Sequence, residues 1–319
     1  MTNLVNPIKT NYFLKKKEFN NLLHLIIKHR GLMLLMVPGL ALLIIFSYIP
    51  MYGIVLAFKH YDVELGILGS PWAGLYHFKL FFSNSDLWNV LRNTVEISLL
   101  KLIFGFPAPI IFALLINEFR DGLLKKTIQT ISYLPNFLSW VVVAGLLFVL
   151  LDPTKGIYGL IIKALGTELK VPLATKSMFR PILVISSLWK NVGWGSIIYL
   201  ACISGISSEL YEAAVIDGAG RLKQAIHITF PSLSPVIAFL LVMDVSSVLS
   251  AGFDQIYNLY NPIVYEVADV IDTYVYRLGL VNMNFELSTA IGLSKTVVAF
   301  LLLVLANSVI KKFSEYAIW

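Results

Sequence analysis

Six long apolar runs alternate with five polar connections along the chain. A helix needs about 20 predominantly apolar residues to cross the hydrocarbon core of a bilayer. We therefore predict six spanning helices, at 31–57, 93–116, 131–151, 182–205, 231–253 and 288–310. The connections between them are 58–92, 117–130, 152–181, 206–230 and 254–287. An even number of spans places both chain ends on the same side of the membrane.

Composition supports the same picture. Of 319 residues, 57% are hydrophobic and 14% are charged, and the mean hydropathy is +0.77, whereas soluble domains carry roughly 25% charged residues. The single cysteine, Cys202, excludes an internal disulfide and a cysteine-based metal cage. The apolar run after residue 30 is too long for the core of a signal peptide. We expect an all-α polytopic membrane protein with an uncleaved tail at 1–30, one membrane domain at 31–310 and a C-terminal segment at 311–319.

The distribution of charge predicts the orientation. Cytoplasmic connections carry an excess of Lys and Arg. With the N-terminus inside, the inner segments hold 13 basic and 7 acidic residues, and the outer loops hold 9 basic and 10 acidic residues. We therefore predict that both ends lie in the cytoplasm. The net charge of +6 then reflects membrane orientation, and it does not call for a nucleic-acid partner.

The fourth connection, 206–230, has the pattern of two short helices joined by a turn. Ser207-Ser208 can supply the N-cap of the first helix, and Glu209 and Glu212 place negative charge in its first turn, where the helix dipole favours it. Asp217-Gly218 marks the turn, since glycine readily takes a positive φ. Helices this short are not stable alone in water. On the predicted topology this connection is cytoplasmic, and we expect a docking partner to cover it.

The same connection resembles the EAA loop of ABC importer permeases. That pattern reads EAA, three residues, G, nine residues and I-x-L-P. Here it is met by EAA at 212–214, by Gly218 and by ITFP at 228–231, with Phe230 as the one departure. Asp217 and Ala219 match the sugar-permease variant, EAAxxDGA, whereas Ala225 stands where many relatives carry an aromatic residue.

The similarity extends over nearly the whole chain. Three segments resemble the polysaccharide-type sugar permeases of these importers, which are similar to maltose-type permeases. They are PMYGIVLAFKHYD (50–62), QTISYLPNFLSWVVV (129–143) and FDQIYNLYNPIVYEVADVIDTYVYRLGL (253–280). The resemblance implies the MetI-like fold of type I ABC importer permeases. It also implies that the loop forms a coupling helix in a cleft of a cytoplasmic ATPase. The docking residues would be Glu212, Ala213, Ala214, Asp217, Gly218 and Ala219. The alternative is an amphipathic loop resting on lipid headgroups.

No G-x-x-x-x-G-K-[ST] phosphate loop occurs in the sequence. We therefore expect a non-catalytic chain that binds no cofactor, with ATP and Mg used by the partner ATPase. The resemblance implies a bacterial cell-membrane complex with a second, related permease subunit. It also implies two copies of the ATPase and an extracytoplasmic sugar-binding lipoprotein, which would deliver an oligosaccharide or polysaccharide fragment.

Polar residues form stripes at helical spacing within three predicted spans. Charged and polar groups are costly in lipid, so they mark substrate paths or helix contacts. The candidate path residues are Lys190, Asn191, Trp194, Tyr199, Asp244, Ser247, Gln255 and Lys295. One alternative is that Asp244 and Lys295 form a structural pair in the bundle. Glu96 and Lys101 lie closer to helix ends, where such side chains extend toward the interface.

Two other functions remain as alternatives. A secondary sugar transporter would need no ATPase, but it gives no reason for the EAA spacing. A membrane glycosyl-transfer enzyme would need a catalytic cluster, and Asp269-x-x-Asp272 is the only candidate. Acids at that spacing are common in solvated loops, and no histidine supports a metal site there. We therefore expect no metal and no catalytic residue in this chain.

Overall fold

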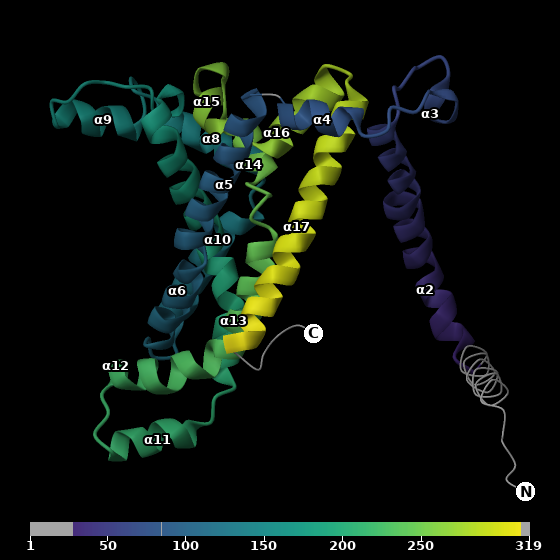
Figure 1. Ribbon diagram of the computed structural model, residues 1–319. Coiled ribbons are helices and arrows are strands. Elements are labelled where there is room, and N and C mark those ends of the chain that lie inside the picture. Colours follow the sequence, from purple (N-terminus) through teal and green to yellow (C-terminus); the bar gives the residue numbers. More distant parts are fainter. Residues whose placement is uncertain (1–27, 84, 314–319) are drawn as a thin grey trace, which may run out of the picture. The chain divides into compact units, whose positions relative to one another are not determined.

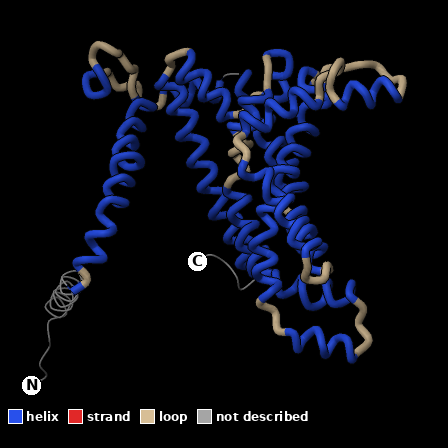
Figure 2. The backbone as a smooth tube through the Cα atoms, turned by 180° about the vertical axis from the view of Figure 1, so that it is seen from behind, coloured by secondary structure: helices blue, strands red, loops and turns tan. Residues whose placement is uncertain are grey.

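The computed structural model describes residues 28–83 and 85–313, and helices dominate that part (Figures 1 and 2). Its described residues form no β-sheet, only an isolated antiparallel bridge between Lys59 and Trp72. The predicted all-α class is therefore confirmed. Most of the basic tail, 1–27, and the C-terminal residues 314–319 lie outside the described residues.

The chain divides into two compact units, Met1–Val55 and Leu56–Trp319. In the first unit, α2 (Arg30–Leu43) continues through a π-helical turn, η1 (Ile44–Tyr48), into the 3-10 helix η2 (Ile49–Phe58). Among the described residues of this unit, 28–55, nearly all apolar side chains are exposed. Such a surface is stable only where lipid or another protein surrounds it.

The second unit contains the remaining long helices. They are α5 (Ser85–Gly105), α6 (Pro107–Asn117), α7 (Leu123–Tyr133), η3 (Leu134–Phe137), α8 (Trp140–Leu150), α10 (Lys176–Ser204), α13 (Phe230–Ser246) and α17 (Phe285–Phe313). Between α10 and α13 lie α11 (Ser208–Ile216), α12 (Arg221–Gln224) and the π-helical turn η5 (Ala225–Thr229).

Within the described residues, four helices are long and apolar enough to cross a membrane: Arg30–Phe58, Leu87–Asn117, Arg221–Val245 and Phe285–Val309. A fifth crossing results if Leu123–Phe137 and Trp140–Leu150, bent by 104°, form one span. Helix α10 is 29 residues long, but polar residues interrupt its apolar sequence. The six-span count therefore stays a prediction.

Shorter elements gather at the two ends of the second unit. At one end lie α4 (Tyr76–Ser83), α9 (Ile157–Ala164), α15 (Tyr265–Ala268) and α16 (Ile271–Tyr276), and at the other end lie α11 and α12 (Figure 1). Helix α14 (Phe253–Leu259) follows α13 toward the α15–α16 end. The connection 206–230 thus lies at the opposite end from the connections 152–181 and 254–287.

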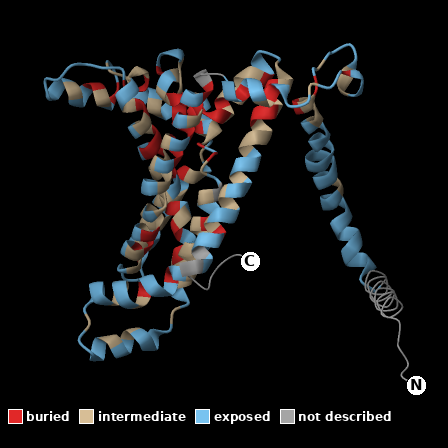
Figure 3. Ribbon diagram, in the orientation of Figure 1, coloured by how far each residue is buried: buried red, intermediate tan, exposed pale blue. Residues whose placement is uncertain are grey.

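Helix α10 is central to the packing of the second unit. Phe179 and Leu183 are fully buried in one cluster with Ile256 and Leu259 of α14. Figure 3 shows buried segments within the helix bundle of the second unit. Further along α10, Tyr199 and its neighbours pack on α6 and α13. Glycines allow α10 to approach other helices closely, because a Cβ at position 193 would lie 2.0 Å from the Ser132 carbonyl oxygen. This dense contact fixes the side chains of α10 relative to the rest of the unit.

Three predicted elements differ from the structure. The span 231–253 is helical only to Ser246, and residues 247–252 form a non-helical segment in which Gly252 has φ +93°. The span 131–151 bends sharply before Ser139, whose side chain caps α8. The second short helix of 206–230 is not separate, because α12 continues through η5 into α13. Hydropathy does not register such breaks or continuities, because it measures composition and not the direction of the backbone.

Candidate functional site: a helical hairpin and a polar cavity

Helix α11 and the start of α12 form a hairpin whose geometry follows from its caps. The Ser207 hydroxyl accepts a hydrogen bond from the Glu209 backbone amide at 3.3 Å and so begins α11. At the turn, the Ala219 amide donates to the Ala214 carbonyl at 2.8 Å. Gly218 has φ +76°, a conformation that costs other residues free energy. The predicted cap and turn are therefore confirmed.

Side-chain hydrogen bonds hold the two arms of the hairpin together. The Tyr211 hydroxyl lies 2.9 Å from the Thr229 hydroxyl, and the Gln224 amide donates to the Ala219 carbonyl at 2.8 Å. Arg221 forms an ion pair at 3.5 Å with Glu118, just beyond the end of α6. These contacts fix the conformation of the hairpin and attach it to the end of α6.

The hairpin presents small and apolar side chains to the outside. Of the six predicted docking residues, Glu212, Ala213, Asp217 and Gly218 are exposed, and Ala214 and Ala219 are half-buried. Beside them, Ile216 is 86% exposed. Ala214 and Ala219 also line a hollow of about 380 Å³ between the arms. The predicted docking residues therefore lie together on one short surface segment.

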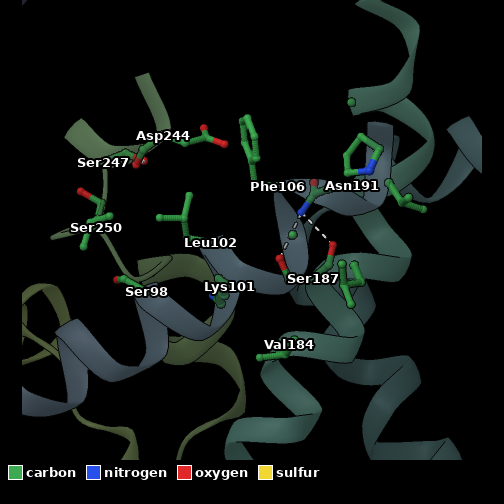
Figure 4. Close-up of a pocket in the computed structure, with 16 residues that line it drawn as sticks. Ser98, Lys101, Leu102, Phe106, Val184, Ser187, Asn191, Asp244, Ser247 and Ser250 are labelled. Atoms are coloured by element: carbon green, nitrogen blue, oxygen red, sulfur yellow. Dashed lines mark hydrogen bonds between the residues drawn. The ribbon is translucent and has the colours of Figure 1, made fainter. Parts of the chain in front are cut away.

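A polar cavity of about 410 Å³ lies among α5, α6, α10 and the end of α13. Its polar lining residues are Ser98, Lys101, Ser187, Asn191, Asp244, Ser247 and Ser250. Figure 4 shows Asp244, Ser247 and Ser250 on one side of the cavity and Ser187 and Asn191 on the other. Hydroxyl, amide, carboxylate and ammonium groups thus converge on one space in an otherwise apolar bundle.

Hydrogen bonds position two groups in the cavity wall. The Asn191 amide nitrogen donates to the Ser187 carbonyl at 2.9 Å, and its oxygen accepts from Asn136 at 3.2 Å. The Lys101 ammonium donates to the Ala251 carbonyl at 2.6 Å and to the Gln255 side-chain oxygen. Both acceptors of Lys101 are neutral, so its positive charge is not cancelled by a bonded carboxylate.

Gln255 links Lys101 to α10. Its side-chain nitrogen donates to the Leu183 carbonyl and to the Ser186 hydroxyl, both at 2.8 Å. Three elements, α5, α14 and α10, therefore meet at one chain of hydrogen bonds. Gln255 is 1% exposed and lies behind the cavity wall.

Of the eight predicted path residues, three line the cavity: Asn191, Asp244 and Ser247. Trp194 is exposed and meets Phe137 edge-to-face at 5.5 Å. Tyr199 is buried in the packing between α6 and α10. The structure therefore brings only part of the predicted stripes to one place.

Lys190 is buried and serves the bend between α7 and α8. Its ammonium donates to the carbonyls of Pro135 at 3.2 Å, Asn136 at 2.7 Å and Leu138 at 2.6 Å. These carbonyls lie where the chain turns by 104° and loses its helical partners. The contacts assign Lys190 to stabilisation of the bend.

Lys295 pairs with Asp272 of α16 and not with Asp244. Asp269 pairs with Arg277 and accepts a hydrogen bond from Thr273 at 2.8 Å. The two acids considered for an enzyme are thus bound to separate cations. Among the described residues, no group of three or more His, Cys, Asp or Glu side chains is arranged to hold a metal ion.

An ionic network lies at the end of the unit away from the hairpin. Arg180 of α10 donates to the Asn93 side chain at 2.7 Å and to the Val267 carbonyl at 3.1 Å, and it pairs with Glu96. Asn93 in turn donates to the carbonyls of Glu266 at 3.0 Å and Asp269 at 3.1 Å. Glu96, expected to extend to the interface, therefore joins α5 to α10.

Sequence reasoning missed Lys101, Ser98, Ser187 and Ser250 as cavity residues. Lys101 did carry a signal, because no acidic residue stands three or four positions away on its helix to pair with it. The serines carried none, since serine is common in spanning helices, where it bonds to its own backbone.

Comparisons with known proteins agree with this arrangement. Residues 105–315 match the family described as "Binding-protein-dependent transport system inner membrane component". The polygalacturonan/rhamnogalacturonan transport system permease protein YteP of Bacillus subtilis (strain 168) is 43% identical over 305 residues, 96% of this chain and 95% of that protein. Protein LplB of the same organism is 42% identical over 288 residues, covering 90% and 91%.

A solved structure has the same fold. A chain of a bacterial ABC transporter involved in the import of the acidic polysaccharide alginate superposes with a TM-score of 0.85 at 39% identity. The match covers 92% of this chain and 99% of that one. A second structure of the alginate transporter, in complex with an alginate pentasaccharide-bound periplasmic protein, matches with a TM-score of 0.84 at 38% identity.

Proposed function

This chain belongs to the family of binding-protein-dependent transport system inner membrane components, and from that membership we propose that it is a permease subunit of an ATP-driven ABC importer for oligosaccharides or polysaccharide fragments. The observation that carries the proposal is the placement of the two sites. A fastened hairpin with the EAA spacing lies at one end of a helix, and a polar cavity lies at the other.

Acidic oligosaccharides are the first substrates to consider. Two similar proteins are named for polygalacturonan/rhamnogalacturonan transport and for import of alginate. The cavity offers hydroxyl and amide groups that can bond sugar hydroxyls. It also holds the Lys101 ammonium, whose bonded acceptors are neutral. A carboxylated sugar would complement that charge.

The hairpin is proposed to dock into a cytoplasmic ATPase, which would use ATP and Mg. Its small residues permit close approach of a partner, and its exposed apolar side chains, such as Ile216, gain stability when covered. The assembly would contain a second, related permease, two ATPase copies and an external sugar-binding protein. One similar structure is titled as a complex with a periplasmic protein, which supports the last partner.

Co-purification with the ATPase tests the docking proposal. Glu212→Lys reverses a charge on the docking surface, and Gly218→Pro is incompatible with φ +76°. Both should abolish retention of the ATPase while the permease stays in the membrane. Glu209→Lys changes an exposed acid on the same helix, outside the docking set, and should retain the partner. If the ATPase binds all three variants equally, the docking proposal fails.

Uptake measurements test the cavity as the substrate path. Asp244→Asn keeps a polar group of the same shape, whereas Asp244→Leu removes it. We expect the Leu variant to lower uptake of an oligogalacturonate or alginate oligomer more strongly than the Asn variant does. Full uptake by the Leu variant would exclude Asp244 from the path.

We propose the six-span topology with both ends in the cytoplasm, and its orientation can be tested by thiol labelling. In a Cys202→Ser background, Lys163→Cys places one thiol on α9 and Lys223→Cys places one on the hairpin. An impermeant maleimide added to intact cells should label position 163 only, because the two positions lie on opposite sides. Labelling of position 223 alone would reverse the orientation.

A further inference from the structure

Helix α14 has a buried face and an aromatic face. Gln255, Ile256 and Leu259 are at most 1% exposed. Phe253, Tyr257 and Tyr260 recur at positions i, i+4 and i+7, which places them on another stripe of the helix. The open face of such a helix normally carries charged or small polar residues. Here it carries rings, and Tyr257 is 40% exposed.

The rings from α14 and α16 form one continuous surface. Phe253 stacks on Tyr257 with centroids 5.2 Å apart and an interplanar angle of 18°. Tyr276 of α16 meets Tyr257 edge-to-face at 4.9 Å, and Tyr260 lies 6.0 Å from Tyr257. We call these four rings, Phe253, Tyr257, Tyr260 and Tyr276, the aromatic ladder. Since two helices contribute, the ladder is fixed by tertiary structure.

The ladder continues the wall of the polar cavity. Ser250 lines the cavity, and Phe253 begins α14 three residues later. The segment between them is held because the Ala251 carbonyl accepts from Lys101, which also lines the cavity. Gln255, on the opposite face of α14 from Tyr257, binds the same ammonium. The ladder is thus joined rigidly to the cavity, and it lies toward the end of the unit remote from the hairpin (Figure 1).

The chemistry of the ladder matches a sugar ring. A pyranose has an apolar C–H face and a rim of hydroxyls. A tyrosine likewise combines an apolar ring face with a polar edge. Asp254 and Asn258 flank Tyr257 on α14 and place a carboxylate and an amide beside the rings. The Asn258 amide nitrogen donates to the Asp254 backbone carbonyl at 2.7 Å. A lipid chain would offer the exposed Asp254 carboxylate no hydrogen-bond donor, whereas sugar hydroxyls can donate to it.

Two phenols of the ladder, those of Tyr257 and Tyr260, stay protonated at physiological pH. The hydrogen bond with Tyr276 raises the pKa of the Tyr257 phenol, and burial raises the pKa of Tyr260 to about 12. The Tyr257 hydroxyl donates to the Tyr276 hydroxyl at 3.5 Å, so its ring face is the part of Tyr257 that a sugar would contact.

We propose that the aromatic ladder is a sugar-stacking subsite at the outer mouth of the cavity, where it holds one pyranose unit of the oligosaccharide against its ring faces. This inference rests on the proposed function and adds to it a second contact point for the same ligand. An oligosaccharide long enough to reach both cavity and ladder gains affinity from the ladder. A short sugar that fills only the cavity does not.

Uptake kinetics of the complete transporter test the subsite. The probes are tetramers of galacturonate and of alginate, and the one that the unmodified transporter takes up faster is used. Tyr257→Phe keeps the ring, and Tyr257→Leu removes it. Phe300→Leu is the control, because Phe300 is an exposed aromatic on α17, away from the ladder. Aromatic contacts of this kind change affinity by about 2–10-fold.

We expect Tyr257→Leu to raise the KM for the tetramer by about that factor with the maximal rate unchanged. Tyr257→Phe and Phe300→Leu should match the unmodified transporter, and the KM for the dimer should change less in the Leu variant. Equal KM values in all variants overturn the subsite while leaving the importer function intact. If the unmodified transporter imports neither probe, the proposed substrate class fails, and the subsite fails with it.

A second measurement separates a sugar subsite from a protein interface. If Tyr257→Leu loses the second permease or the external binding protein on purification, the ladder is a docking surface and the inference is wrong. If the variant does not accumulate, Phe253→Leu is measured in its place, since Phe253 stacks on the same ring.

Discussion

Adding a single methyl group at Gly193 should force two helices apart. The Cβ of Gly193→Ala would lie 2.0 Å from the carbonyl oxygen of Ser132, 2.4 Å from its carbonyl carbon and 2.9 Å from its Cβ. Two of these atoms are backbone, so no change of rotamer relieves the contact. Because non-bonded carbons are most stable about 3.5–4.0 Å apart, α10 must move away from α7 by roughly 1 Å or more.

The cost of this movement can be worked out from neighbouring contacts. Overpacking in a dense interior costs about 1–3 kcal/mol. Lys190, one turn away on α10, donates to carbonyls at 2.6 and 2.7 Å. A shift of this size stretches those bonds past hydrogen-bond length, which adds about 1.5 kcal/mol for a charged donor. The expected loss of folding free energy for Gly193→Ala is therefore about 2.5–4.5 kcal/mol.

Thermal unfolding of the purified complex in detergent measures this loss. In domains of about 150–250 residues each kcal/mol shifts the unfolding midpoint by about 2–4 °C. With that factor as an upper guide for this longer chain, Gly193→Ala should melt at most roughly 5–18 °C lower. Gly145→Ala on α8 is the matched control, because its Cβ would meet nothing within 4 Å. If the two variants melt at the same temperature, α7 and α10 are not in the contact described here.

Three further variants probe individual contacts. Lys190→Met should lower the unfolding midpoint by several degrees, because it leaves one buried and two partly buried carbonyls at the α7–α8 bend without this donor. Arg180→Lys should also destabilise the complex, since an ammonium cannot reproduce the guanidinium fork that binds Glu96 and two further groups. The pKa of Glu266 is lowered by its hydrogen bond from Lys176. This exposed ion pair contributes a small amount to the free energy of folding, which is present above about pH 4.5 and is lost as the pH falls through the lowered pKa. Glu266→Gln should therefore flatten that part of a curve of stability against pH.

Exposed cations supply the controls for the first two of these. Lys163→Met on α9 removes an exposed ammonium that lacks the three carbonyl partners of Lys190, and it should leave the midpoint unchanged. Arg92 also pairs with Glu96, and the Arg92 side chain is 74% exposed. Arg92→Lys should therefore lower the unfolding midpoint much less than Arg180→Lys does. Equal midpoints for a variant and its control would contradict the role assigned to that contact.

The hairpin was predictable because its determinants are local. Ser207 as a cap and Gly218 at the turn act within a few residues, and the sequence contains both partners of each contact. Helix content also followed from apolar runs, because lipid leaves the backbone no other regular structure besides closed barrels.

The cavity was only partly predictable because its geometry depends on distant contacts. Lys101 meets Ala251 and Gln255, which lie about 150 residues later, and those contacts accompany the break after Ser246. Helical periodicity placed Gln255 on one stripe with Asp244, but the break starts a new helix and turns Gln255 behind the wall. A pattern within one segment cannot register a change of direction that another segment stabilises.

The helix that runs without a break from Arg221 to Ser246 sets a phase relation between the hairpin and the cavity. Every residue advances an α-helix by about 100° and 1.5 Å. The number of residues between the turn at Gly218 and Asp244 therefore determines the direction in which Asp244 faces. One residue inserted near Ala238 would rotate Asp244 by about 100° relative to the hairpin and turn it away from the cavity, although every residue of both sites is still present. The number of residues between the two sites therefore matters as much as the residues of the sites themselves, because it sets the angle between the hairpin and the cavity.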